Sequence, residues 1–149
     1  MGKVTTLTHE FVEFIPDELK EERLYISVQY ATVAHKCCCG CGKEVVTPLS
    51  PTDWKLVFDG KTVSLDPSIG NWSFQCRSHY WIRNNRVKWA AQWTQKQIDR
   101  GRAHDRFTKE KYFDTTAGTK HTASQDYAGE SEVDKPLRKV WHALKKLWS

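Results

Sequence analysis

The sequence has no long hydrophobic run, and this absence limits the class of protein that it encodes. No stretch of about 18 apolar residues occurs among its 149 residues, so we expect no membrane-spanning helix. It also opens without a secretory signal peptide, which leads us to expect a cytoplasmic protein whose thiols stay reduced. A chain of this length predicts one domain with a tail.

A net positive charge is also missing from most of the chain. The net charge is +5, but residues 135–149 hold five basic side chains and no acidic one, so the rest of the chain is neutral. A neutral main domain argues against nucleic-acid binding. Nucleic-acid binding stays an alternative function because residues 83–111 hold nine bases against three acids and have tryptophans nearby that suit base stacking.

Cysteines are few and occur in only two places. Four lie in the segment His35-Lys36-Cys37-Cys38-Cys39-Gly40-Cys41-Gly42, and the fifth opens Cys76-Arg77-Ser78-His79. The odd count and the three consecutive cysteines argue against disulfides. Zinc sites need three or four soft or borderline ligands, usually a tight pair from one turn and a second pair from elsewhere. The pattern therefore predicts a structural zinc site, with a catalytic cysteine beside His79 as the alternative.

The residues leave the choice of ligands open. Cys37, Cys39 and Cys41 stand at alternating positions, while Cys38-x-x-Cys41 offers a second arrangement. Two thiols from this cluster would complete a Cys3His site together with Cys76 and His79. His35 is an outside candidate at the end of a predicted strand.

The segments that alternate in polarity predict a β-rich domain. We expect strands over residues 24–33, 44–49, 54–58, 61–65, 72–76, 79–83 and 86–90. Asp59-Gly60 predicts a two-residue type I′ turn, Asn84-Asn85 is expected to connect the strands of a second hairpin, and 66–71 is expected to be a loop. One or two helices should follow between residues 92 and 113. The expected class is α+β, with antiparallel hairpins stapled by zinc and followed by helices.

The last third of the chain predicts a linker and a separate helix. Residues 1–113 should form the zinc-binding domain and 114–133, rich in Thr, Ser, Gly, Asp and Glu, a flexible linker. Residues 134–149 place apolar side chains at helical spacing opposite basic ones, which predicts a basic amphipathic helix. This helix would dock on its own domain, fill a groove in a partner protein or lie on an anionic membrane surface.

The motifs between His35 and Ala90 resemble those of a small bacterial family classified as a domain of unknown function. The resemblance rests on His35-x-Cys37-x-Cys39-Gly40-Cys41-Gly42, Pro67-Ser68-Ile69-Gly70-Asn71-Trp72 and Cys76-Arg77-Ser78-His79-Tyr80-Trp81. Genes of that family often lie beside those of bacterial ubiquitin-like proteins, E1-like activating enzymes and E2-like carriers. The resemblance implies that Cys38 varies, so that four zinc ligands come from Cys37, Cys39, Cys41, Cys76 and His79.

Two functions in a ubiquitin-like pathway follow from this resemblance. The first is a zinc-stabilised accessory or interaction protein that binds a ubiquitin-like, E1-like or E2-like partner. The second is a hydrolase, namely a peptidase that processes or removes a ubiquitin-like tag. For a peptidase, Ser68 and Ser78 are the candidate nucleophiles and His79 the base, and His35 would replace His79 if His79 bound the metal.

Overall fold

The structure is a computed structural model that describes residues 2–125. The chain divides into a first compact unit, Met1–Thr108, and a second that begins at Lys109. The predicted C-terminal helix over 134–149 lies outside the described residues. None of the described helices is both long enough and apolar enough to span a membrane.

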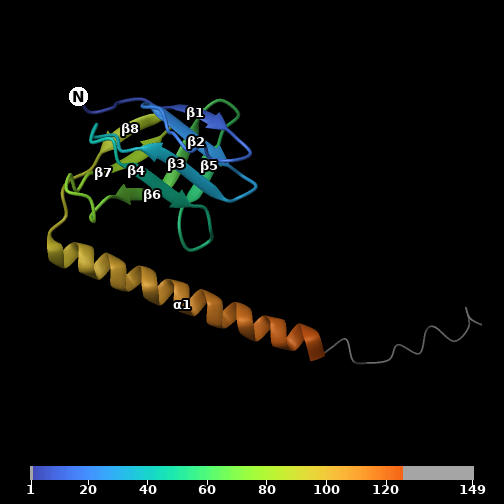
Figure 1. Cartoon of the computed structure of the whole chain (residues 1–149). Coiled ribbons are helices and arrows are strands. Elements are labelled where there is room, and N and C mark those ends of the chain that lie inside the picture. The colour runs from blue at the N-terminus through green and yellow to red at the C-terminus, as the bar shows by residue number, and fades with distance from the viewer. Residues whose placement is uncertain (1, 126–149) are drawn as a thin grey trace, which may run out of the picture. The chain divides into compact units, whose positions relative to one another are not determined.

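Two four-stranded sheets make up the β-rich part of the described chain (Figure 1). The first sheet holds, in spatial order, β1 (Thr8–Phe11), β2 (Arg23–Ser27), β3 (Thr32–Lys36) and β4 (Glu44–Pro48). The second holds β5 (Lys55–Phe58), β6 (Val63–Gly70), β7 (His79–Arg83) and β8 (Arg86–Trp89). All neighbouring strands are antiparallel except β1 and β2, which are parallel. The predicted α+β class is thereby confirmed.

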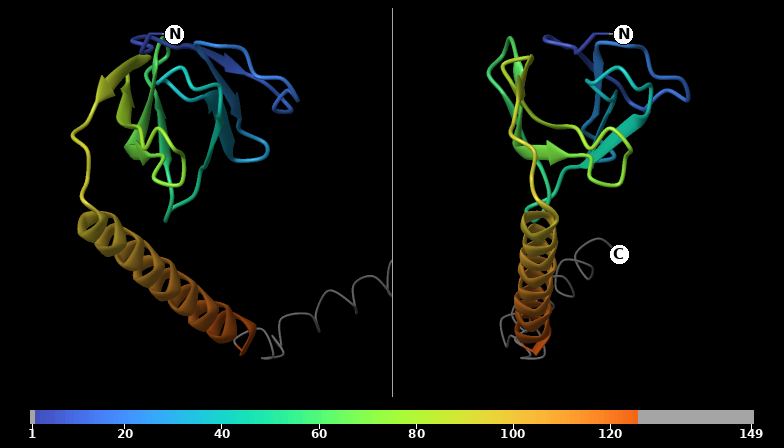
Figure 2. Two further views of the ribbon diagram at one scale, coloured as in Figure 1. Left: turned by 60° about the vertical axis from the view of Figure 1, so that its left-hand side comes forward. Right: turned by 90° about the vertical axis from the view of Figure 1, so that its left-hand side faces the viewer.

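One apolar core joins the two sheets, which form two layers in Figure 2. Leu24 and Ile26 of β2 and Leu65 and Ile82 of the second sheet are all fully buried in the same cluster. Leu24 and Ile26 are two residues apart on β2, as expected where alternate side chains of a strand face the core. Leu65 and Ile82 lie directly opposite each other on β6 and β7. Burial of this apolar area is the main driving force for the association of the sheets.

Two predicted strand boundaries were wrong. Residues 24–33 form a hairpin rather than one strand, because the chain turns between Ser27 and Thr32 and Ala31 takes a positive φ of 46°. The expected loop at 66–71 is mostly part of β6, while 72–76, expected as a strand, is a turn. Pro67, a residue that favours loops, lies in an irregular stretch of β6 where ladder pairing is interrupted, whereas Gly70 is paired with His79.

Both predicted hairpins are present, although one has a different turn. Asn84 and Asn85 have φ values of 49° and 63°, as a type I′ turn requires. The turn at Asp59 spans four residues, since Phe58 pairs with Val63. Its geometry is held by the Asp59 carboxylate, which accepts hydrogen bonds from the backbone N–H groups of residues 61 and 62.

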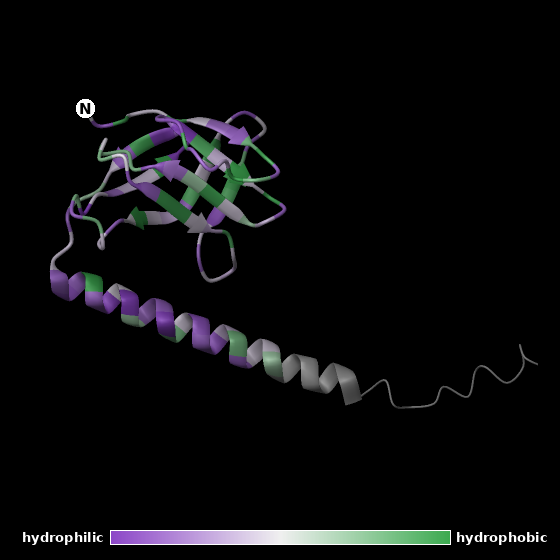
Figure 3. Cartoon of the chain, in the orientation of Figure 1, coloured by the Kyte–Doolittle hydropathy of each residue, from purple (hydrophilic) through white to green (hydrophobic). Residues whose placement is uncertain are grey.

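A single helix, α1 (Gln95–Gln125), follows the second sheet within the described chain. Thr94 and Gln97 form a reciprocal cap at its start: the Thr94 N–H donates to Gln97 Oε1 and the Gln97 N–H to Thr94 Oγ1. The helix is predominantly hydrophilic (Figure 3) and continues into the predicted linker segment 114–133 as far as residue 125. A low content of apolar residues therefore does not prevent a helix from forming in this segment.

We expect Asp59→Ala to lower the melting temperature at pH 7, because the carboxylate holds the turn between β5 and β6. Hydrogen bonds from the Thr62 hydroxyl and from the N–H groups of residues 62 and 61 lower the pKa of Asp59 to about 2. A lowered pKa stabilises the folded state above about pH 4, and this contribution is lost as the pH falls through about 2. The difference from wild type, measured by thermal unfolding, should therefore narrow below pH 4. Equal effects of Asp59→Ala and of Asp17→Ala, at an exposed loop aspartate, would contradict this role.

Candidate active site and metal centre

An irregularity in β6 presents Ser68. Leu65 pairs with Ile82 and Ile69 with Tyr80, so β6 has two more residues than β7 between these two pairs. Such insertions interrupt the ladder and redirect side chains, and they are frequent beside active sites. The extra residues lie in the segment that ends at Ser68.

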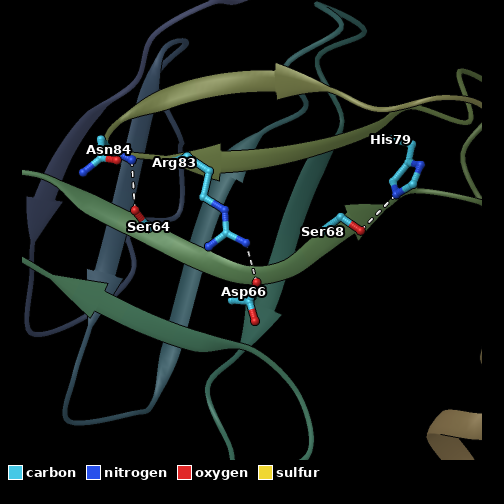
Figure 4. A network of polar contacts seen from close by, with 6 residues as sticks. All are labelled: Ser64, Asp66, Ser68, His79, Arg83 and Asn84. Carbon is cyan, nitrogen blue, oxygen red and sulfur yellow. Dashed lines mark hydrogen bonds and ion pairs between the residues drawn. The ribbon is translucent and has the colours of Figure 1, made fainter.

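Ser68 contacts the imidazole of His79, the first residue of β7 (Figure 4). The distance from Ser68 Oγ to His79 Nε2 is 3.0 Å. The other ring nitrogen, Nδ1, lies 2.8 Å from the backbone carbonyl oxygen of Ala91. A hydroxyl, a histidine and a group that orients the histidine are the parts that nucleophilic catalysis by serine requires.

The carbonyl of Ala91 decides which ring nitrogen carries the proton. A carbonyl oxygen only accepts hydrogen bonds, so Nδ1 must donate and therefore holds the proton of the neutral ring. Nε2 is then left with its lone pair and accepts the hydrogen bond from the Ser68 hydroxyl. This is the tautomer in which His79 can take a proton from Ser68.

Three tryptophans surround the His79 ring. Its centroid lies 4.9 Å from that of Trp72, 5.1 Å from Trp93 and 5.8 Å from Trp81. Trp72 and Trp93 stack on each other with an angle of 19° between their planes. His79 keeps 3% of its surface exposed. The indoles thus restrict rotation of the imidazole and exclude water from its faces.

Space for Trp72 depends on a glycine of β6. A Cβ atom at Gly70 would lie 2.3 Å from Trp72 Nε1, which is far closer than any real contact. The absence of a side chain two residues after Ser68 therefore allows the indole to cover this part of the strand.

The carboxylate nearest to Ser68 in the sequence does not orient His79. Asp66 forms an ion pair with Arg83, and the Ser64 hydroxyl accepts from the backbone N–H of Asn84, on the same stretch of β6 and β7 (Figure 4). No residue type signals the group that does orient the ring, since Ala91 acts through its backbone carbonyl.

Four of the five cysteines form a second cluster. The Sγ atoms of Cys37, Cys39, Cys41 and Cys76 all lie within 4.8 Å of one another, and together they can hold a metal ion. Sulfur atoms that bind zinc tetrahedrally at about 2.3 Å are separated by about 3.8 Å. The observed separations are 3.4 Å for Cys37–Cys39, 3.9 Å for Cys37–Cys76 and 3.8 Å for Cys41–Cys76. The four thiols therefore fit a metal of this size.

The cluster joins the two sheets. Three of its thiols come from the turn between β3 and β4, and Cys76 comes from the connection between β6 and β7. The turn is shaped by Gly40 and Gly42, which have φ values of 83° and 75°. This confirms that the first cysteine segment lies in a strand–turn–strand unit.

The thiols of this cluster differ in acidity. Burial raises the pKa of the Cys37 and Cys39 thiols. Burial acts in the same direction on Cys76, but hydrogen bonds from the backbone and hydroxyl of Ser78, and from Cys39 and Cys41, outweigh it and lower its pKa to about 7. A bound cation would favour the thiolate form of all four.

The remaining candidates lie elsewhere. Cys38 is buried in the core, and burial raises the pKa of its thiol to about 12. His35 is fully buried, with Nε2 2.9 Å from the Tyr80 hydroxyl, and burial lowers its pKa to about 4. Ser78 Oγ lies 3.1 Å from Cys37 Sγ and accepts from Asn71 at 2.9 Å. Of the three predicted catalytic candidates, only Ser68 contacts His79, and His79 stands outside the four-cysteine cluster.

Comparison with known proteins identifies the family. Neither the curated proteins nor the solved structures contain a significant match. Residues 11–90 match the family described as the bacterial ubiquitination-like system serine protease, BubE. This match covers more than half of the chain, including all five cysteines, Ser68 and His79. The chain therefore belongs to the BubE family of bacterial ubiquitination-like systems.

Proposed function

We propose that the protein is a serine peptidase that cleaves the bond at the C-terminus of a ubiquitin-like protein, with Ser68 as nucleophile and His79 as base. The observation that carries this proposal is the contact between Ser68 Oγ and His79 Nε2, with Nδ1 held by a carbonyl. The family description supports it. The peptidase proposal therefore takes precedence over the accessory role, which stays a prediction. Membership of a ubiquitination-like system implies protein partners in either case.

The geometry supports acyl transfer through His79. As Ser68 Oγ attacks the scissile carbonyl carbon, its proton passes to His79 Nε2, and Nδ1–H stays bonded to the Ala91 carbonyl. The imidazolium then donates the proton at Nε2 to the leaving amine, and the C–N bond breaks. Water, activated by the same nitrogen, hydrolyses the acyl-serine and restores both side chains.

The Ala91 carbonyl replaces the carboxylate of a Ser-His-Asp triad. It fixes the tautomer and the ring position as a carboxylate would, but it carries only a partial negative charge. It therefore stabilises the imidazolium less strongly. The tryptophans complete the orientation of the ring by packing on it.

The proposed metal is zinc, held by Cys37, Cys39, Cys41 and Cys76. Four thiolates fill a tetrahedral coordination shell and leave no position for water, which is typical of a structural site. When bound, zinc would stabilise the fold by fixing the β3–β4 turn to the connection that precedes β7. Since Cys76 is three residues before His79, the same attachment positions the start of β7.

Ser78 and Asn71 support the thiolates from within the protein. The Ser78 hydroxyl lies 3.1 Å from Cys37 Sγ and 3.6 Å from Cys76 Sγ, and Asn71 Nδ2 donates to Ser78. Hydrogen bonds of this kind orient metal ligands and tune their charge. Ser78 thus serves the metal centre, whereas Ser68 serves the reaction.

Replacing Ser68 by Ala should abolish cleavage, because the hydroxyl is the attacking group. The substrate is the ubiquitin-like protein of the same bacterial system, joined at its C-terminus to a reporter domain, and cleavage is followed by gel electrophoresis. Ser68→Ala and His79→Ala should each reduce kcat/KM at least about a thousandfold, and the double variant should be no slower than either. Ser64→Ala, on the same strand, is the matched control and should retain activity. Cleavage by Ser68→Ala at the wild-type rate would refute the assignment.

Elemental analysis of purified variants should separate the four cysteines from His79. We expect one zinc per chain in the wild type and in His79→Ala, because both ring nitrogens of His79 have other partners. Cys41→Ser should lose the metal, because it removes one of the four thiolates. Cys41 is chosen because it is the most exposed of the four, so that its replacement perturbs the core least. Cys38→Ala is the control for a buried thiol outside the cluster and should keep the metal. Loss of zinc from His79→Ala with retention in Cys41→Ser would overturn the ligand set.

A further inference from the structure

Strand β6 has an open edge beside Ser68. Strand β5 pairs with it only as far as Lys55, opposite Asp66, whereas β7 continues along Ile69 and Gly70. On the β5 side, no strand in residues 2–125 pairs with Ile69 or Gly70. Adjacent residues of an antiparallel strand direct their backbone N–H and C=O groups to opposite edges. One of these two residues therefore directs its hydrogen-bonding groups toward the open edge.

Two hollows border this part of β6. The first, of about 460 Å³, is lined by Asp66, Pro67 and the segment 49–55. The second, of about 320 Å³, is lined by Ile69, Gly70 and Asn71 among others, and Trp54 lines both. The β6 residues of the two linings are the two that precede Ser68 and the two that follow it. Both volumes fall in the range of ligand-binding sites.

Strand β4 meets the second hollow with its edge. Four consecutive residues, 44–47, line the hollow, although Val45 is buried and Val46 is 59% exposed. Successive side chains of a strand point to opposite faces, so a hollow that touches all of them borders the strand along its backbone. Strand β4 is the last of the first sheet, and in the described chain it pairs only with β3. Two open strand edges thus border one hollow.

We propose that the two hollows form one groove that binds the extended segment of the substrate next to the scissile bond, as an added strand beside Ile69 and Gly70. The proposal rests on the proposed function, since the segment is that of the ubiquitin-like protein. Strand addition supplies affinity through backbone hydrogen bonds, while hollows accept alternate side chains. Ser68 lines neither hollow but lies between Pro67 of the first lining and Ile69 of the second, so a segment bound along both would pass the nucleophile.

The charge of the groove indicates which segment it favours. Its linings include three acids, Glu44, Asp53 and Asp66, against one base, Lys55, and Asp66 is already paired with Arg83. Complementary charge selects partners and speeds their association. The segment that binds best should therefore be extended and carry a basic side chain near the scissile bond.

Amide hydrogen exchange on Ser68→Ala tests the strand addition directly. The probe is the intact ubiquitin-like protein of the same system, which this variant should bind without cleaving it. We expect amide exchange in residues 69–71 and 44–47 to slow at least about tenfold in the complex, as backbone groups gain partners. Slowed exchange confined to β8 or to β1 would overturn the proposal.

A large charged residue in the groove should block it. We expect Val46→Arg to lower kcat/KM for the reporter-fused protein by about tenfold or more, as truncations and blocks at central interface residues do. Val28→Arg, at an exposed valine in the turn between β2 and β3, is the control and should change kcat/KM less than about twofold. Equal effects of the two variants would overturn the groove.

Labelling of Ser68 by a small fluorophosphonate distinguishes a failure of the groove from a failure of the proposed function. Labelling needs the Ser68–His79 pair but no extended substrate. If wild-type Ser68 is not labelled and does not cleave, the proposed function fails. If it is labelled, and Val46→Arg reduces cleavage no more than it reduces labelling, the groove alone fails.

Discussion

Four thiols from the connections of both sheets occupy one small volume, and the position of His79 depends on that constraint. Cys76 is fixed against the turn between β3 and β4, and the chain then has only Arg77 and Ser78 before it reaches His79. The φ of Arg77 is positive, at 43°, so the short connection bends sharply. A metal at the four thiols would therefore stabilise the fold and the geometry of the proposed active site together, and the proposed mechanism gives it no part in the reaction.

The proposed active site joins an irregular strand to a regular one. The additional residues of β6 bring Ser68 into contact with the ring of His79. His79, on β7, is held in register opposite Gly70 of β6. Because the orienting group is a backbone carbonyl, the site needs no third catalytic side chain. The pairing with β5 ends at Asp66, within the same irregular stretch, and leaves open the edge where we place the substrate.

Local signals predicted local structure. The Asn84-Asn85 turn follows from residues that tolerate positive φ, and the cysteine turn follows from its two glycines. Cysteine-x-x-histidine spacing suits a metal pair as well as a serine–histidine site, so the sequence alone did not separate the two roles of Cys76 and His79. The roles of the Ala91 carbonyl and of the open edge of β6 depend on tertiary pairing and on backbone groups, for which no residue type is a signal.

The tautomer of His79 is the most direct test, because the ring is proposed to accept a proton at Nε2 and not to bind the metal. Nitrogen-15 NMR of the zinc-loaded protein at neutral pH measures the protonation of both ring nitrogens. We expect Nδ1 to be protonated and Nε2 to be unprotonated, and we expect the Nε2 resonance to change in Ser68→Ala but to show no coupling to cadmium-113 when cadmium replaces zinc. A proton on Nε2 in the resting protein, or coupling of either nitrogen to the metal, would contradict the account.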